Sequence, residues 1–282
     1  MASTYVTPGG AGANLSIKKW KRKIEPALYD KPRAYTKFKE TGESIMNQLA
    51  IRRLGRIAGQ TLSSSNDGTS FDFQDLGPTV ITLDPVWLMC PAAWPDSAPR
   101  RMGMEVGPAF RKNVEDALSA AIEYLGLSVA TLTTATPLGN AGYSINAAGF
   151  RGVLQDVATD SHMAVEPGDA GMYMILNTSQ IAACLDIPEV GQAYQGSGGK
   201  SPYISGITSD GAGWKVLFTT LATLDANGYN GLAWADDAIQ YGYNKRPDVE
   251  DQRYLKQNRI MADAEVGFAI VYNEKCKAIR TA

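Results

Sequence analysis

The sequence predicts an α+β fold, because one long amphipathic helix stands among short apolar segments that have the composition of strands. In residues 108–126 the apolar side chains recur every three or four positions, and most charged ones lie off that stripe. Pro108 suits the first helical turn, and Gly126 suits the end of the helix. A second helix is predicted at residues 147–163.

The strands are predicted from apolar runs bounded by turn residues. Residues 172–177, MYMILN, follow a Pro-Gly-Asp turn and are predicted to form a buried strand. Residues 262–272 are apolar on both faces, so we expect a central strand that is covered on both sides of its sheet. Residues 273–275 would then turn the chain into a last short strand, CKAIRT.

Short helices and loops are predicted in the remaining chain. Residues 43–58 carry apolar side chains at roughly helical spacing, which predicts a short helix. Asn177 is predicted to cap another short helix, with Gln180 in the reciprocal capping-box position. Residues 61–96 combine a polar, Gly-containing stretch with short apolar runs, which is typical of strands around a loop. Residues 188–213 are rich in Gly and Ser and indicate a long loop.

Composition limits the class of protein. The 282 residues suffice for one large domain or two modest ones, and 44% hydrophobic with 20% charged residues fit an ordinary folded chain. No apolar run reaches the roughly 18 residues of a membrane-spanning helix, and the N-terminus lacks the apolar core of a signal peptide. We therefore expect a soluble protein made in a cytoplasm, with no membrane partner.

Catalytic and metal-binding patterns are nearly absent from the sequence. The single histidine, His162, has no suitable cysteine near it, so it does not predict a catalytic triad. Cys90, Cys184 and Cys276 lie far apart and form no C-x-x-C pair, which favours buried thiols over a disulfide framework or a zinc site. We expect no catalytic residue, no cofactor and no metal ion, and hence a protein that is not an enzyme.

Two short motifs are similar to ligand-binding loops but depart from them. GSGGKSP at residues 196–202 ends like a P-loop, yet Tyr194 stands where that motif has its first glycine. DANGYNG at residues 225–231 begins like a calcium loop, yet Tyr229 stands at the next ligand position. Both stretches are therefore interpreted as loops without a bound ligand.

Basic residues are concentrated near the N-terminus. Residues 1–60 contain 12 basic and 4 acidic side chains, a net charge of +8, whereas residues 61–282 contain 15 and 25, a net charge of −10. Within residues 14–39 aromatic side chains are set among basic ones, and Pro26 and Pro32 prevent one continuous helix. We interpret this stretch as an extended arm.

The residues of this arm leave two interpretations open. Basic side chains interleaved with aromatic ones are typical of nucleic-acid binding, but no recognition motif accompanies them. A basic arm on an acidic body also favours contact with a neighbouring protein. We prefer the protein contact, and the two interpretations do not exclude each other.

The order of the elements resembles the major capsid proteins of tailed bacteriophages, which have the Hong Kong 97-type fold. The order runs from a basic arm and a strand-rich loop to a long helix, a mixed region, a glycine-rich part and C-terminal strands. RIMADAEVGFAIVYNEKCKAIRT (259–281) looks like the closing hairpin of that family. MYMILNTSQIAACL (172–185) looks like the strand and helix that lead into its axial domain. The resemblance spans nearly the whole chain and contains no invariant motif.

The resemblance implies a division of the chain into five parts. They are an N-terminal arm (1–55), an E-loop (56–97), a spine helix at about 108–126, a peripheral domain (98–180 and 248–282) and an axial domain (181–247). The axial domains of several copies would meet around fivefold and sixfold axes, where the loop at 188–213 can adapt.

The function implied by the resemblance is self-assembly into pentamers and hexamers that form an icosahedral head shell around a double-stranded DNA genome. The partners would be other copies of this chain, scaffolding, portal and decoration proteins, and packaged DNA through nonspecific contact. The protein would assemble in the host cytoplasm and reside in the virion. The expected intersubunit residues of the arm are Lys18, Lys19, Trp20, Lys21, Arg22, Lys23, Tyr29, Tyr35 and Phe38. Those of the E-loop are Phe71, Phe73, Val86 and Trp87.

Two departures from the family narrow this expectation. No long N-terminal domain precedes the arm, so we expect no maturation cleavage of such a domain and a separate scaffolding protein, if one is used. Residues 57–99 contain no lysine, so we expect no covalent cross-link from the E-loop.

Two alternative functions are kept beside the capsid interpretation. An encapsulin-like shell would share the fold but enclose enzyme cargo in a bacterium, and the neighbouring genes would distinguish it. A nonspecific nucleic-acid-binding protein would act through the basic arm. Salt-sensitive DNA binding by the monomer would support that function, whereas particles of uniform size would contradict it.

Overall fold

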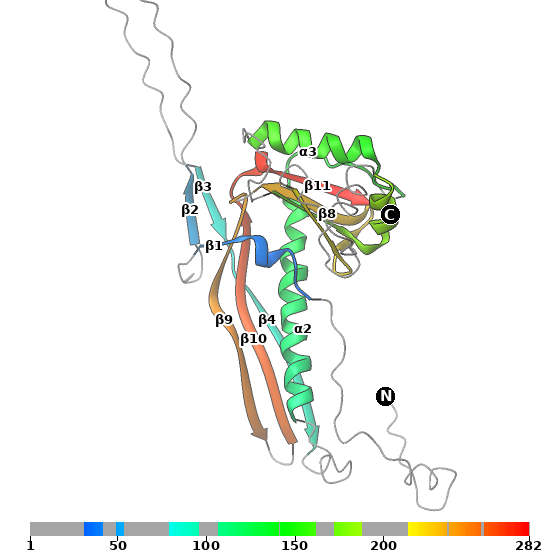
Figure 1. Cartoon of the computed structure of the whole chain (residues 1–282). Helices are drawn as coiled ribbons and strands as arrows, with labels where there is room; N and C mark the ends of the chain where they lie inside the picture. Colours follow the sequence, from blue (N-terminus) through cyan, green and yellow to red (C-terminus); the bar gives the residue numbers. More distant parts are fainter. Residues whose placement is uncertain are drawn as a thin grey trace, which may run out of the picture.

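The computed structural model describes residues 31–41, 49–53, 79–95, 107–140, 142–161, 172–187, 214–235, 237–254 and 257–281. In these residues a long, narrow sheet lies beside a long helix, and a smaller sheet covered by a second helix lies at one end of the molecule (Figure 1). One buried apolar cluster includes side chains from the long helix and from both sheets, so the two parts share a core.

The long sheet has four strands in the order β1-β9-β10-β4. Its strands are β1 (Lys39–Glu40), β4 (Val86–Pro95), β9 (Ile239–Tyr254) and β10 (Gln257–Ile270). β1 runs parallel to β9, and the other pairs are antiparallel. The helix α2 (Gly107–Ser128) packs along β10 and β4, which confirms the helix predicted at 108–126.

β10 is the central strand that its apolar sequence predicts. It pairs with β9 on one side and with β4 on the other. On the face that α2 covers, Ala262, Ala264 and Val266 are fully buried. On the opposite face the side chains of Trp87 and Lys245 cover Asp263, so polar and aromatic side chains contribute to the expected second layer.

The smaller sheet has five strands. They are β5 (Met172–Asn177), β6 (Trp214–Thr219), β7 (Thr223–Asp225), β8 (Gly228–Ala235) and β11 (Cys276–Thr281). The order is β11-β8-β5-β6, with β7 paired to β8. The helix α3 (Ala147–Ser161) packs over β8 and β11. A second apolar cluster lies between α3 and this sheet.

Three local predictions for this part of the chain are confirmed. The strand β5 covers the six residues predicted, and α3 begins at the residue expected. The Asn177 side chain accepts a hydrogen bond from the backbone N–H of Ser179 and caps η4 (Thr178–Gln180), which continues into α4 (Ile181–Leu185). Gln180 is buried, and its Oε1 accepts a hydrogen bond from the backbone N–H of Ile145.

A two-stranded hairpin corrects the helix predicted at 43–58. β2 (Leu49–Arg53) pairs antiparallel with β3 (Thr79–Leu83). Ile51 packs with Leu83 and with Ala269 of β10. The segment also has period-two spacing at Leu49 and Ile51. Its partner β3 is rich in β-branched residues, and pairing with that strand outweighs the preference for helix that the local apolar spacing indicated. The rest of the predicted helix lies outside the described residues.

The C-terminal strands do not form the hairpin expected at 259–281. η6 (Asn273–Lys275) makes the predicted turn, but β10 stays in the long sheet and β11 pairs with β8 in the smaller one. Turn residues fix where a chain reverses but not which partner the next strand finds.

The sheets also group the residues differently from the expected peripheral and axial ranges. The limit expected between residues 180 and 181 separates β5 from β6, although these strands pair in parallel. The limit expected at 247/248 cuts through β9. Val86–Pro95, expected in the E-loop, form a strand of the long sheet. Sheet pairing joins segments that lie far apart in the sequence, so the strands of one sheet fall in more than one expected range, and the domain ranges themselves stay a prediction.

Candidate assembly surface

β4 is an edge strand among the described strands of the long sheet. Its residues alternate strictly between the two faces of the sheet. The inward side chains Leu88, Cys90, Ala92 and Trp94 belong to the core beside α2. The ring of Trp94 stacks on Phe110 of α2, with 5.0 Å between the ring centroids. This packing fixes which face of β4 is turned outward.

Apolar side chains are exposed to solvent on the outward face of β4 (Trp87 and Met89), at its first residue (Val86, on the alternate face) and on the preceding strand β3 (Val80). The exposed fractions are 62% for Trp87, 51% for Met89, 44% for Val86 and 54% for Val80 of β3. Large apolar side chains gathered on an edge strand are typical of a surface that associates with another protein. We call these four residues the β4 surface.

The indole of Trp87 is held in place by a buried carboxylate. Trp87 Nε1 donates a hydrogen bond to Asp263 Oδ2 over 3.2 Å, and Lys245 Nζ donates to the same oxygen over 2.7 Å. Asp263 is almost fully buried, and its hydrogen bond raises the pKa of Lys245 above its usual value. The exposed ring therefore has a defined orientation before any partner binds.

The rest of β4 combines a hollow with a limited capacity for strand pairing. An open hollow of about 450 Å³ is lined by Pro91, Ala93 and Met261 among others. Pro91 and Pro95 lack a backbone N–H group, which limits pairing of this edge with another strand. The arrangement favours side-chain contact with a partner over extension of the sheet.

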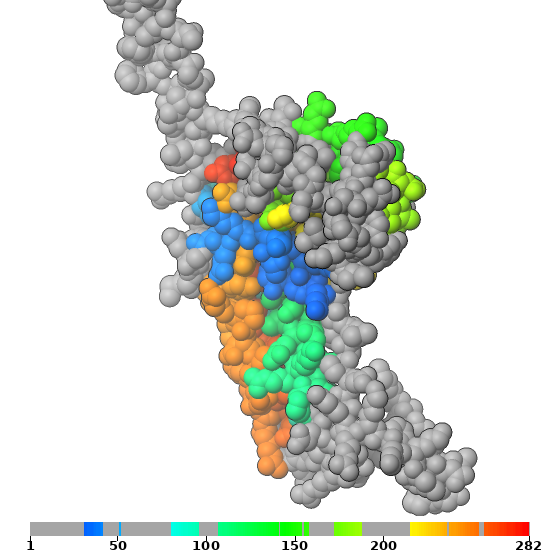
Figure 2. Space-filling view, viewed as in Figure 1, coloured from blue at the N-terminus to red at the C-terminus, as the bar shows by residue number. Residues whose placement is uncertain are grey.

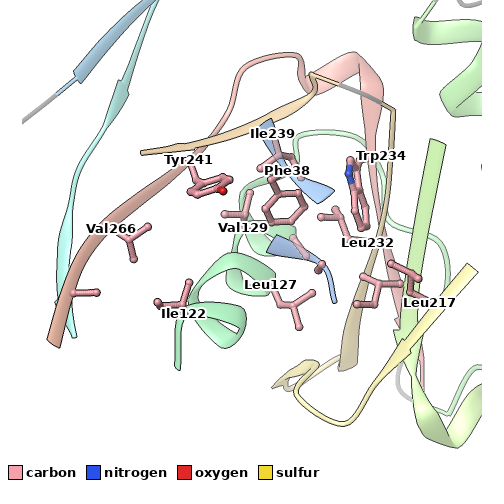
Figure 3. Close-up of a cluster of buried hydrophobic side chains, with 14 of the residues drawn as sticks. Phe38, Ile122, Leu127, Val129, Leu217, Leu232, Trp234, Ile239, Tyr241 and Val266 are labelled. Atoms are coloured by element: carbon pink, nitrogen blue, oxygen red, sulfur yellow. The ribbon is translucent and has the colours of Figure 1, made fainter. Parts of the chain in front are cut away.

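Residues 31–41, which we call the arm root, lie across α2 and β9 (Figure 2). The Phe38 side chain is 6% exposed, and its ring meets Trp234 at 5.2 Å and Phe268 at 6.1 Å between centroids. Figure 3 shows the Phe38 ring among Val129, Leu232 and Trp234. Phe38 therefore packs in the core of its own chain, which corrects its expected role as an anchor in a neighbour.

Tyr35 is half-buried and also contacts its own chain. Its ring lies edge-on to Tyr241 at 6.1 Å between centroids. Burial, and to a lesser extent the charge of Glu123, raise the pKa of the Tyr35 phenol. Tyr35 therefore makes an internal contact with part of its ring, and its expected contact with a neighbouring copy stays a prediction.

Glu123 of α2 fixes the start of the arm root. Its side chain is fully buried and accepts hydrogen bonds from the backbone N–H groups of Arg33, Ala34 and Tyr35, over 2.8 to 3.0 Å. Glu123 lies off the apolar stripe of the helix, and it is buried because the arm root covers this side of α2 near its C-terminal end.

Ion pairs hold the other end of the arm root to β9 and the loop before it. β1 pairs in parallel with β9. Lys39 Nζ lies 2.7 Å from Asp237 Oδ1, and Arg246 donates to Glu40 Oε1 over 2.6 Å. These pairs are largely exposed, so the burial of Phe38 and Ala34 is the stronger attachment.

Most of the expected intersubunit residues lie outside the described residues. These are Lys18, Lys19, Trp20, Lys21, Arg22, Lys23, Tyr29, Phe71 and Phe73. Val86 and Trp87 are described and exposed, and they lie next to each other at the start of β4. Met89 and Val80 were not predicted, although the period-two alternation of β4 could have indicated Met89.

The described residues contain no group of three His, Cys, Asp or Glu side chains that could hold a metal ion. His162 and the loop at 196–202 lie outside the described residues. Cys184 and Cys276 are buried and Cys90 is half-buried, all as free thiols, and burial raises the pKa of Cys184 to about 12. None of the described helices combines the length and the apolar character needed to cross a bilayer.

No protein-family model and no curated protein sequence matches this chain. Solved structures do match it over nearly its whole length. A capsid structure of the cyanophage P-SCSP1u has a TM-score of 0.70 at 11% identity, covering 98% of this chain and 95% of that one. A structure from Mycobacterium phage Che8 has a TM-score of 0.70 at 14% identity, covering 93% and 96%.

A capsid of Ralstonia phage GP4 has a TM-score of 0.66 at 13% identity, covering 99% of this chain and 97% of that one. The identities are low, but in all three comparisons the similarity in structure covers more than nine tenths of both chains. The chain therefore has the α+β fold of phage capsid proteins, the Hong Kong 97-type fold.

Proposed function

We propose that this chain is the major capsid protein of a tailed bacteriophage. Copies of it assemble into pentamers and hexamers, which form the icosahedral head shell around a double-stranded DNA genome. The observation that carries the proposal is the match of the whole chain to capsid subunits, with no large part of either chain left over. The role is structural, so the chain needs no catalytic group.

The β4 surface supplies one contact between copies in this proposal. Trp87 is an aromatic side chain already held by Asp263, so little conformational freedom is lost when a neighbour covers it. Burial of the apolar side chains around it, away from water, stabilises the contact between copies. Each contact can be weak, because a closed shell repeats it many times.

The two sheets correspond to the two domains of the family in this proposal. The long sheet with α2 forms the peripheral domain, and α2 is its spine helix. The smaller sheet with α3 and α4 forms the axial domain, which meets other copies around the fivefold and sixfold axes. The hairpin of β2 and β3 is the base of the E-loop, whose remaining residues would lie across a neighbour.

The arm that precedes Lys31 supplies a second contact. Residues 1–60 carry a net charge of +8 and the rest of the chain −10, so the arm is attracted to the body of a neighbouring copy. The cluster from Lys18 to Lys23, with Trp20 and Tyr29, would make this contact. Contact of the same residues with packaged DNA remains compatible with it, because the charges attract phosphate equally.

Electron microscopy of the purified protein tests the proposal. We expect closed particles of uniform size, because every copy presents the same surfaces. A protein that stays monomeric at all concentrations and binds DNA in a salt-sensitive way would contradict the proposal and favour the nucleic-acid-binding function. Reversing the charges of Lys18 to Lys23 tests the arm separately, since unimpaired assembly would refute its role between copies.

A further inference from the structure

We infer that Glu123 is a positioning residue for the arm, fixing the place and direction in which residues 1–30 leave the body. Glu123 lies in the C-terminal half of the long helix and is 0% exposed. A carboxylate in such a place is costly unless it is well hydrogen-bonded. Its hydrogen-bond partners are three successive backbone N–H groups of the arm root, so the carboxylate stabilises the position of the arm root rather than the helix.

The geometry uses both oxygens of the Glu123 side chain as hydrogen-bond acceptors. Oε1 accepts from Arg33 and Ala34, and Oε2 accepts from Tyr35. A glutamine at this position would offer one acceptor, and its NH₂ group would face a backbone N–H group. An aspartate is shorter by one carbon but keeps both oxygens. Substitution by glutamine therefore tests the need for a second acceptor oxygen, and substitution by aspartate tests the need for the length of the side chain.

The contact lies where it can direct the arm. Arg33 is two residues after Lys31, the first residue that the structure describes, whereas Phe38 and the ion pairs of Lys39 and Glu40 hold the far end of the arm root. Without Glu123 the root would stay attached at Phe38, but its first residues could turn away from α2. An arm of 30 residues spans at most roughly 100 Å when extended, so its starting direction decides which neighbouring surface it meets.

Trypsin digestion of the full-length protein before assembly measures the attachment. The bonds after Arg33 and Lys37 lie in the arm root, and those from Lys18 to Lys23 lie in the arm itself. In Glu123→Gln we expect cleavage after Arg33 to accelerate by at least about tenfold, relative to cleavage at Lys18 to Lys23 in the same sample. Glu123→Asp should recover part of the protection.

Glu115→Gln is the matched control, because Glu115 lies on the same helix but is exposed and pairs with Arg111. Its cleavage pattern should equal that of the unmodified protein. If Glu123→Gln does not fold, Glu123→Leu asks the same question, since leucine packs in an apolar core and offers no acceptor. Equal protection of Arg33 in the unmodified protein and in a folded Glu123 variant would overturn the inference.

The consequence for assembly rests on the proposed capsid function, but the digestion does not. In a protein that forms shells, Glu123→Gln should lower the yield of uniform particles, while Glu115→Gln should leave it unchanged. Failure of the unmodified protein to form particles would contradict the capsid function and leave the digestion result standing. Normal particles from a variant whose arm root is released would refute the positioning role.

Discussion

The arm root and β4 contain the same kind of side chain in opposite situations. Phe38 in the arm root is 6% exposed and is surrounded by its own chain, whereas Trp87 in β4 is 62% exposed. Both are aromatic residues that the sequence assigned to contacts between subunits. The difference shows that an aromatic residue near a basic or loop segment indicates a contact, but not whether its partner belongs to the same chain.

The two regions differ in what lies opposite them. The arm root crosses the point where α2 meets both sheets, so three elements surround Phe38. β4 lies at the edge of its sheet, where β10 is the one strand that it pairs with in the described part of the chain. We therefore expect the arm root to contribute to the stability of the subunit and the β4 surface to contribute to assembly.

Among these substitutions, Phe38→Ala is expected to lower the free energy of unfolding of the subunit most. The substitution removes a ring that contacts Trp234 and Phe268 and leaves a cavity, so the free energy of unfolding should fall by about 3–5 kcal/mol. Urea denaturation followed by tryptophan fluorescence measures the change. A loss below about 1 kcal/mol would show that the arm root is not part of the core.

Asp263→Asn should have an intermediate effect on the subunit. It removes the charge that accepts hydrogen bonds from Trp87 and Lys245, while the volume of the side chain is kept. Because Lys245 is well exposed, we expect a smaller loss of unfolding free energy than for Phe38→Ala. The pKa of Lys245 should fall toward its usual value, which NMR titration can follow. An unchanged pKa would contradict the assigned hydrogen bond.

The smallest effect on the subunit is expected from Trp87→Ala. An exposed side chain contributes little to folding, so the unfolding free energy should change by less than about 1 kcal/mol. The yield of closed particles should nevertheless fall sharply, as measured by sedimentation and microscopy. Tyr124→Ala is the matched control, since Tyr124 is also aromatic, is 51% exposed and lies in α2 rather than in β4 or the smaller sheet. An equal yield of closed particles from both variants would show that β4 does not contact a neighbouring copy.

The sequence was sufficient for elements whose pattern is local. The long helix, β5, the cap at Asn177 and the turn before β11 follow from apolar spacing and turn chemistry within a few residues. The strand β2 was missed because its partner β3 is almost thirty residues away in the sequence. Local spacing carries no information about such a partner.

The candidate surface was predictable only in part. Val86 and Trp87 were named as E-loop contacts through the resemblance to capsid proteins, and the structure shows both exposed, while their contact with a neighbouring copy stays a prediction. The burial of Glu123 could not be found, since a glutamate beside an apolar helix stripe normally faces water. Its burial depends on a segment about ninety residues earlier in the chain, which the helix pattern does not reveal.

A cryo-electron-microscopy reconstruction of particles assembled from the purified protein tests the central claim most directly. We predict that Phe38 lies in the core of its own subunit and that Trp87 and Met89 are covered by a neighbouring copy. A closed shell in which β4 faces solvent would contradict the account. A shell in which Phe38 is inserted into a different subunit would contradict it as well.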